Sequence, residues 1–222
     1  MKKLILLFII TCITSSIIAQ DWANLERFKE ENTSIMQEEI TGKRIVFMGN
    51  SITEGWSTFD SVFFSENQFI NRGIGGQTTP QMLLRFKQDV IDIKANTVIV
   101  LAGINDIAEN TGPISLKQIL GNIISMCELA NQNNIRVILC SVLPANKFPW
   151  EPKINPTQNV IDLNEMLLDY ANSKSITYVD YYSKMVDDKQ ELISAYGYDP
   201  VHPNLESYVI MKHILSEVLE IK

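Results

Sequence analysis

Histidine, cysteine and long apolar runs are all scarce in this chain of 222 residues. Beyond the first nineteen residues, no apolar run approaches the length that a membrane-spanning helix needs. The two histidines and three cysteines form no cluster with the spacing of metal ligands, so we expect no metal site. Basic residues number 19 against 26 acidic ones, which argues against nucleic acid or an anionic lipid surface as a steady partner.

The first nineteen residues have the layout of a secretory signal peptide. Two lysines form a basic start, residues 4–10 are apolar, and a small residue, Ala19, ends the segment. We predict cleavage after Ala19, with lipid attachment at Cys12 as an alternative. Cleavage would leave residues 20–222 as a single domain, and the net charge would move from −7 to −9. The product is expected in a periplasm or outside the cell, without stable membrane insertion.

Short apolar runs alternate with helical patterns along the rest of the chain. Apolar residues recur at helical spacing over residues 116–127, 160–171 and 205–219, and a pattern over 21–40 indicates one amphipathic helix or two short ones. Continuous runs rich in Ile and Val are typical of strands buried on both faces of a parallel sheet. The sequence therefore predicts an α/β domain with a mostly parallel sheet covered on both sides. The five strand candidates are residues 45–48, 69–72, 97–102, 135–141 and 176–179.

Ser51 follows the first strand candidate directly, after the turn residues Gly49 and Asn50. In open α/β sheets, ligands bind beyond the carboxyl ends of the strands, so Ser51 stands where a nucleophile is expected. Serine is also a common helix N-cap, and a capping role alone is the alternative.

Of the two histidines, His213 falls on a polar flank of the closing helix and is expected at the surface. His202 lies in a loop stiffened by proline just before that helix, so a base for Ser51 must be His202. Asp199, three residues earlier, can turn back to hold the imidazole. A turn and helix cap without catalysis is the alternative for Asp199 and His202.

Acyl transfer also requires donors aimed at the developing oxyanion. Three groups are candidates: the backbone N–H of Ser51, the backbone N–H of Gly76, and the side-chain amide of Asn105. Gly76 and Asn105 each follow a predicted strand, and each could instead be an ordinary loop residue.

Taken together, four sequence blocks resemble the SGNH (GDSL-type) family of esterases and lipases. They are G-N-S at 49–51, the G-x-x-G-Q-T-T loop at 73–79, G-x-N-D at 103–106 and D-x-x-H at 199–202. The resemblance implies a flavodoxin-like three-layer α/β/α fold with a central five-stranded sheet. It also implies the nucleophile Ser51, the base His202, the orienting Asp199, oxyanion donors from Ser51, Gly76 and Asn105, and no cofactor. Asn50 and Gln77 replace aspartates that are common in the family.

Three other kinds of protein are alternatives to a serine esterase of this family. The residue two after Ser51 is Thr53, so the G-x-S-x-G motif of an α/β-hydrolase is missing. A flavodoxin would need the first loop to hold phosphate, which Glu54 would repel. A carbohydrate-binding module of the same fold, without catalysis, is the non-enzyme alternative.

The substrate is predicted to be a small-molecule or carbohydrate ester with a short acyl group, most simply acetyl. Trp56, Phe148 and Trp150 are candidates for a pocket wall that stacks on a sugar ring, although each could equally belong to the core. A lysophospholipase or short-chain lipase is the alternative activity. Cys127 and Cys140 are expected as buried free thiols, with a disulfide as the alternative. The sequence does not indicate an oligomeric state.

Overall fold

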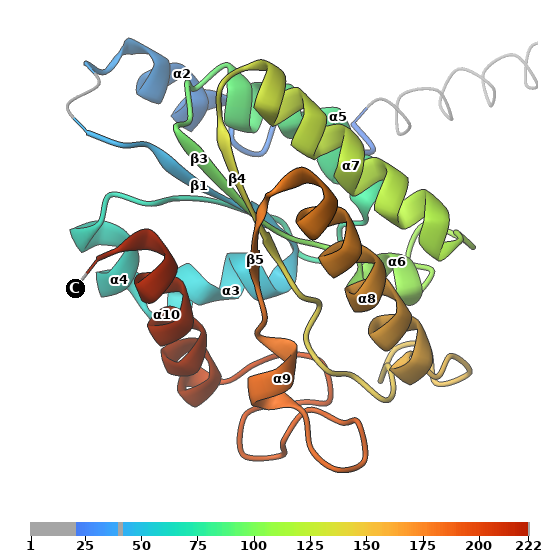
Figure 1. The fold of residues 1–222 in the computed structure, drawn as a ribbon. Helices are drawn as coiled ribbons and strands as arrows, with labels where there is room; N and C mark the ends of the chain where they lie inside the picture. The colour runs from blue at the N-terminus through green and yellow to red at the C-terminus, as the bar shows by residue number, and fades with distance from the viewer. Residues whose placement is uncertain (1–20, 40–41, 222) are drawn as a thin grey trace, which may run out of the picture.

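The computed structural model describes residues 21–39 and 42–221. The expected signal peptide over residues 1–19, including Cys12, lies outside the described residues. The described part is a three-layer α/β/α arrangement, which confirms the predicted fold class (Figure 1).

The central sheet has five strands in the order β2-β1-β3-β4-β5, and every neighbouring pair is parallel. The central strands β1 and β3 are buried at every residue and β4 at all but its first, as their apolar runs predicted, whereas the edge strands β2 and β5 are only partly buried. Each strand lies within about one residue of its predicted bounds. The strands are β1 (Ile45–Gly49), β2 (Ile70–Gly73), β3 (Thr97–Leu101), β4 (Arg136–Cys140) and β5 (Thr177–Val179).

One face of the sheet is covered by the helices of three crossover connections, which run from β2 to β3, from β3 to β4 and from β4 to β5. Helix α7 packs against both α5 and α8, and α2 lies beside the π-helical turn η1 that follows α5. A four-residue helix, α6, follows β3 directly. The bounds are α2 (Lys29–Gln37), α5 (Thr79–Phe86), η1 (Lys87–Ile91), α6 (Ile104–Ile107), α7 (Leu116–Gln132) and α8 (Thr157–Lys174).

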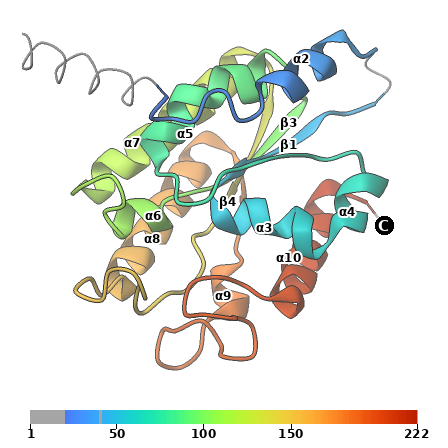
Figure 2. The same ribbon diagram turned by 180° about the vertical axis from the view of Figure 1, so that it is seen from behind.

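The other face is covered by α3 (Ser51–Phe59), α4 (Ser61–Glu66) and α10 (Leu205–Leu219). Figures 1 and 2 show α10 alongside α3, although the two helices come from opposite ends of the chain. Tyr208 joins them: its hydroxyl donates to the Ile52 carbonyl at 2.8 Å, and its ring stacks on Trp56 at 5.6 Å. This packing fixes the loop that enters α10 above the start of α3.

Outside the sheet layers, α9 (Tyr182–Met185) follows β5. The amphipathic pattern over 21–40 forms turns followed by the nine-residue α2 rather than one long helix. Cys127 and Cys140, the cysteines that the structure describes, are free and buried, so the alternative of a disulfide is not realised. Burial raises the pKa of both thiols to about 12, which leaves them unreactive. Within the described ranges, no helix is long and apolar enough to span a bilayer.

Candidate active site

Ser51 is the first residue of α3, directly beyond the carboxyl end of β1. Asn50 caps the helix, because its side chain accepts from the Ile52 N–H at 3.0 Å. The turn needs glycine at 49, since a Cβ there would lie 2.0 Å from Thr53 Oγ1 and 2.9 Å from the Leu101 carbonyl. The serine oxygen therefore stands at a helix N-terminus, where the helix dipole favours negative charge.

His202 and Asp199 meet Ser51 from the other end of the chain. Ser51 Oγ and His202 Nε2 are 3.0 Å apart, and His202 Nδ1 is 2.7 Å from Asp199 Oδ2. Because the carboxylate can only accept, Nδ1 carries the proton and Nε2 is free to accept from the serine hydroxyl. The structure thus brings the three predicted side chains together in the order that a general base needs.

The Asp199 carboxylate is fixed by its own loop. Its Oδ1 accepts from the backbone N–H groups of Val201 at 2.7 Å and His202 at 2.8 Å. Partial burial by itself raises the pKa of Asp199, but these N–H groups and the imidazole outweigh it and hold the pKa below its usual value. Asp199 is therefore ionised at neutral pH and can orient the His202 ring.

The three predicted oxyanion donors lie on neighbouring loops. Gly76 has a φ of +75°, a conformation that favours glycine, and the Asn105 amide donates one proton to the Gln77 carbonyl at 3.0 Å. Among the residues that the structure describes, the backbone N–H groups of Ser51 and Gly76 donate to none. These two N–H groups and the second Asn105 amide proton are available to an external oxygen.

The three aromatic residues predicted to wall the pocket have different positions. Trp56 is 2% exposed and packs at 5.5 Å from Phe47 beneath α10, and Phe148 is 0% exposed. Both predictions were wrong, because the packing of these rings in the core leaves them unable to contact a ligand. Trp150 is 44% exposed, and its ring centroid lies 6.0 Å from that of His202, with Phe148 supporting it from behind at 5.2 Å.

Two further aromatic side chains lie at the site and were not predicted from the sequence. Tyr198 is 63% exposed and stacks on His202 at 5.6 Å, with the rings only 10° from parallel. Phe59, at the end of α3, lies 6.2 Å from Tyr198. The position of Tyr198 immediately before Asp199 was the available signal, because residues of that loop must lie near the histidine.

An open cleft of about 720 Å³ begins at Ser51. Arg27 and Glu54 form an exposed ion pair at 3.3 Å on its lining, and Glu54 also accepts from the Gly75 N–H at 2.8 Å. The lining is therefore mixed, with charged, amide and aromatic groups. It includes Arg27, Ser51, Glu54, Phe59, Asn71 and Tyr198.

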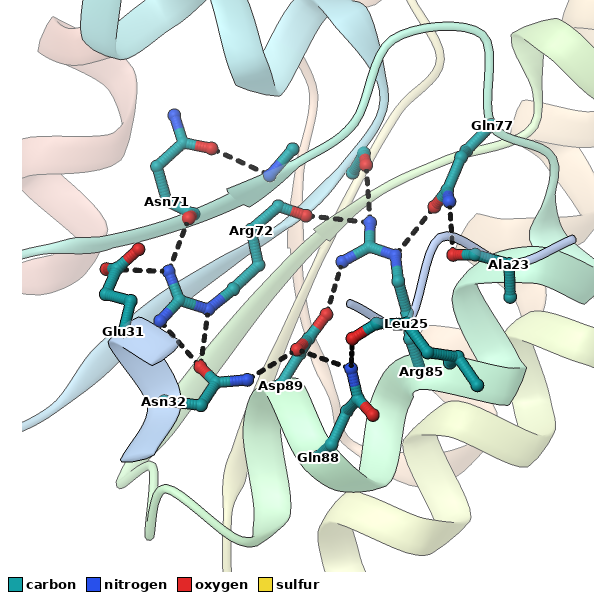
Figure 3. A network of polar contacts seen from close by, with 12 residues as sticks. Ala23, Leu25, Glu31, Asn32, Asn71, Arg72, Gln77, Arg85, Gln88 and Asp89 are labelled. Carbon is teal, nitrogen blue, oxygen red and sulfur yellow. Dashed lines mark hydrogen bonds and ion pairs between the residues drawn. The ribbon is translucent and has the colours of Figure 1, made fainter. Parts of the chain in front are cut away.

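A buried polar network lies behind the Gly73–Thr79 loop (Figure 3). Arg85 is fully buried at its centre and donates to Gln77 Oε1 at 2.6 Å, to the Gly49 carbonyl at 3.0 Å and to the Arg72 carbonyl at 2.8 Å. It also pairs with buried Asp89 at 2.9 Å. One guanidinium thus joins the end of β1, the end of β2 and the loop that carries Gly76.

The same network fixes the segment that precedes α2. Gln77 donates through Nε2 to the Ala23 carbonyl at 2.7 Å, and Asn32 bridges Arg72 Nη2 and Asp89 Oδ1 at 2.7 Å each (Figure 3). Gln77 therefore replaces the aspartate common in the family with a side chain that both accepts and donates. Sequence reasoning missed this network, because arginines in a helix or strand are ordinarily exposed.

Asp106, beside Asn105, fixes the far end of the same loop. Its buried carboxylate accepts from the Thr79 backbone N–H at 2.9 Å and from the Thr79 hydroxyl at 2.6 Å. Burial raises the pKa of Asp106 to about 6, although the Thr79 hydrogen bonds oppose the shift. No group of His, Cys, Asp and Glu side chains in residues 21–39 and 42–221 is arranged to hold a metal ion.

A serine, a histidine and an aspartate at the carboxyl edge of a parallel sheet define the arrangement of a serine hydrolase. Residues 47–210 match the GDSL-like lipase/acylhydrolase family, so the chain belongs to that family, as the sequence blocks predicted. It is 45% identical to a candidate acylhydrolase from Bacteroides fragilis and 44% identical to a GDSL-like lipase from Bacteroides thetaiotaomicron. Each structure gives a TM-score of 0.88, and each match covers 90% of this chain and 98% of the other.

More distant relatives share part of the sequence or the fold alone. The chain spans about half the length of the curated relatives that it matches. One is the platelet-activating factor acetylhydrolase IB subunit alpha2 of Rattus norvegicus, 29% identical over 110 residues, which are 47% of this chain and 46% of that one. The acetylxylan esterase Axe2 of Geobacillus stearothermophilus is 17% identical, with a TM-score of 0.67 over 82% of this chain and 95% of that one. At that identity the likeness concerns the fold alone.

Proposed function

We propose that this protein is a serine esterase that removes a short acyl group, most simply acetyl, from a carbohydrate. The observation that carries the proposal is the 3.0 Å approach of Ser51 Oγ to His202 Nε2, with Asp199 at 2.7 Å on the far side of the ring. Membership of an acylhydrolase family supports the reaction class.

The reaction would run in two acyl-transfer steps. Ser51 Oγ attacks the ester carbonyl while His202 Nε2 takes the hydroxyl proton, and the new oxyanion binds the N–H groups of Ser51, Gly76 and Asn105. The tetrahedral intermediate collapses, and the alcohol leaves with the proton from His202. A water molecule, deprotonated by His202, then hydrolyses the acyl-serine and frees Ser51.

Asp199 contributes without touching the substrate. Its carboxylate stabilises the imidazolium that forms when His202 takes the proton, and it keeps Nε2 directed at Ser51. Because backbone N–H groups hold the pKa of Asp199 below its usual value, the carboxylate stays ionised through the cycle. His202 rather than Asp199 therefore carries the transferred proton.

The surroundings of His202 support a carbohydrate as the alcohol. Tyr198 and Trp150 are both exposed beside the imidazole, where the leaving alcohol must lie, and exposed aromatic faces pack well on sugar rings. The charged and amide groups of the cleft suit a hydroxyl-rich ligand. The names of two relatives, an acetylxylan esterase and an acetylhydrolase, both specify an acetyl group, which supports the acyl side of the proposal.

A short-chain lipase or lysophospholipase is the second candidate. Phe59 favours it, because this ring is 43% exposed on the cleft and could contact an acyl chain. A non-catalytic carbohydrate-binding module would use the same aromatic rings without turnover. We also propose export to a periplasm or beyond the cell, on the basis of the residue pattern over 1–19.

The test compares the wild-type protein with the Ser51→Ala variant. Hydrolysis of p-nitrophenyl acetate is expected to fall by a factor on the order of 10⁶ in kcat, with circular dichroism and thermal midpoint unchanged. Equal, background-level rates for both proteins would favour the binding module. Wild-type rates on esters from acetyl to dodecanoyl, together with acetate release from acetylated polysaccharides, then separate the substrates. A maximum at octanoyl or longer contradicts the carbohydrate-acetate proposal.

A further inference from the structure

The side chain of Asn110 lies between Trp150 and the loop that carries Gly76. Its Oδ1 accepts from the Trp150 indole N–H at 3.1 Å, and its Nδ2 donates to the Gly76 carbonyl at 3.1 Å. Its backbone N–H donates to the Asn105 carbonyl, also at 3.1 Å. Asn110 therefore contacts both loop-borne oxyanion donors and the exposed indole ring beside His202.

The chemistry of the two partners suits an amide at this position. An indole N–H can only donate, and a backbone carbonyl can only accept. A carboxamide satisfies both, because it presents one acceptor and one donor group side by side. A carboxylate would lack the donor, and an aliphatic side chain of the same shape would lack both groups.

Asn110 also ends a row of contacts between two segments. Asn105 bonds to the Gln77 carbonyl, Asp106 to Thr79, and Thr111 Oγ1 to Thr78 Oγ1 at 3.1 Å. The contacts of Asn105 and Asp106 are buried, whereas Asn110 and Thr111 are exposed. The buried contacts fix the fold of the loop, and Asn110 is the member that also bonds to the exposed indole ring of Trp150.

We propose that Asn110 is a positioning residue that couples the binding of the alcohol part of the substrate to the oxyanion hole. The inference rests on the proposed esterase function. A sugar that stacks on Trp150 contacts an indole ring whose N–H donates a hydrogen bond to Asn110. The other end of the Asn110 amide holds the Gly76 peptide in the conformation that directs its N–H at the oxyanion. Substrate contact and transition-state stabilisation then act through one carboxamide.

The experiment uses Asn110→Leu, which keeps the shape and removes both hydrogen bonds, and Trp150→Phe, which keeps an aromatic ring and removes only the indole N–H. Each contact should contribute modestly, because the amide is exposed. For Asn110→Leu we expect a 5- to 20-fold loss in kcat on p-nitrophenyl acetate. This substrate is used because the molecule is too small to depend on contact with Trp150. Inhibition by phenylboronic acid, which forms a tetrahedral adduct with an active serine, should weaken by a similar factor.

Trp150→Phe should raise KM for an acetylated oligosaccharide by 3- to 10-fold. In the Asn110→Leu background the same change should have a smaller effect on that KM, which measures the coupling. Asn133→Leu is the matched control: Asn133 is an exposed asparagine that donates to the Leu129 carbonyl at 2.8 Å, at the far end of α7. It should leave kcat, KM and boronate inhibition unchanged.

The outcomes separate the two proposals. If Ser51→Ala keeps wild-type turnover, the esterase mechanism fails, and this inference fails with it. If Ser51→Ala is inactive but Asn110→Leu keeps wild-type kcat and boronate inhibition, only the positioning role is overturned. Strictly additive effects of the two substitutions on KM would likewise overturn the coupling. Equal thermal midpoints for Asn110→Leu and Asn133→Leu exclude a general loss of folding as the cause.

Discussion

The two groups of loop residues that flank Ser51 are built differently. The oxyanion side, Gly73–Thr79 with Asn105 and Asp106, is supported from behind by the fully buried Arg85 network. The histidine side, Tyr198–Pro203 with Trp150, is partly exposed, and the side chains of Asp199 and His202 retain 28% and 20% of their accessible surface. One side is anchored in the core, and the other faces solvent.

This difference matches the two tasks that the proposed reaction sets. Oxyanion donors are effective when they are fixed before the charge develops, so that no reorganisation occurs during the reaction. The histidine must instead exchange protons with an alcohol and a water molecule, which requires access from the cleft. We therefore expect changes on the histidine side to reduce turnover without unfolding the protein. Changes behind the oxyanion side should reduce stability first.

Within this comparison, the largest expected effect is that of Asp199→Asn on turnover. The amide oxygen can still accept from the Val201 and His202 N–H groups, so the loop should keep its conformation. The imidazole loses the charge that stabilises its protonated form, and the wrong tautomer becomes favoured. We expect kcat for p-nitrophenyl acetate to fall by a factor on the order of 10³–10⁴, with the thermal midpoint within a few degrees of wild type.

A matched control for this variant is Asp180→Asn. Asp180 accepts from the Ser183 N–H at 3.0 Å at the start of α9 and does not contact the three proposed catalytic side chains. Its replacement should leave kcat unchanged. A fall in kcat of less than tenfold for Asp199→Asn would show that Asp199 does not orient the base.

The next largest effect is a loss of stability when the buried Arg85 contacts behind the oxyanion side are removed. Arg85→Met would leave the Asp89 carboxylate buried without its guanidinium partner and remove donors from Gln77 and two carbonyls. Removing one partner of a buried ion pair typically costs about 3–5 kcal/mol. We expect the free energy of unfolding, measured in urea, to fall by about that amount.

Two comparisons sharpen this prediction. Lys29→Met removes an exposed ion pair with Glu26 and should leave the free energy of unfolding close to that of the wild type, because water and salt screen exposed pairs. The double variant Arg85→Met with Asp89→Leu removes the uncompensated charge and should recover part of the lost stability. Equal costs for the buried and the exposed pair would contradict the proposed anchoring.

A smaller effect, visible only as a function of pH, is expected at Asp106. Its pKa in the folded protein, about 6, lies above the 3.8 of an exposed aspartate, so the folded state binds the proton more tightly. The associated stability is fully present below pH 3.8 and is lost as the pH rises through about 6. The contribution of Asp106 to the free energy of unfolding falls by about 3 kcal/mol over this pH range.

Asp106→Asn removes this titration while keeping an oxygen for the Thr79 N–H. Relative to wild type, the variant should therefore gain stability as the pH rises from 4 to 7.5 in urea unfolding experiments. Other carboxylates titrate in both proteins and cancel in the difference. A stability difference that is constant over this pH range would mean that burial does not raise the pKa of Asp106.

The sheet could be predicted from the sequence because its central strands, β1, β3 and β4, are short apolar runs followed by polar or glycine residues. The convergence of residues 51, 199 and 202 followed from the same topology, since parallel strands deliver their following loops to one edge. The cysteines also agreed with the simpler expectation of buried thiols. The amphipathic pattern over 21–40 overestimated the helix, because the Trp22 to Leu25 stretch uses its backbone carbonyls to bind Gln81, Gln77 and Gln88 instead.

The sequence did not predict correctly which side chains lie in the core and which are exposed near the site. Trp56 follows Ser51 by five residues, yet the packing of α10 on α3 buries its ring, and no local pattern encodes that contact. Phe148 and Trp150 are two residues apart in one loop, but only Trp150 is exposed beside His202. Arg85 is a helical arginine whose burial depends on carbonyls from two strands. Such contacts are tertiary and long-range, so spacing alone does not reveal them.

The most direct test of the central claim is covalent labelling of the nucleophile. The wild-type protein would be treated with diisopropyl fluorophosphate, digested and analysed by tandem mass spectrometry, with loss of p-nitrophenyl acetate hydrolysis followed in parallel. We predict one adduct per chain, located on Ser51, whose formation tracks the loss of activity and is slowed strongly in the Asp199→Asn variant. An active protein that is inactivated without modification of Ser51, or is labelled at another serine, would contradict the account.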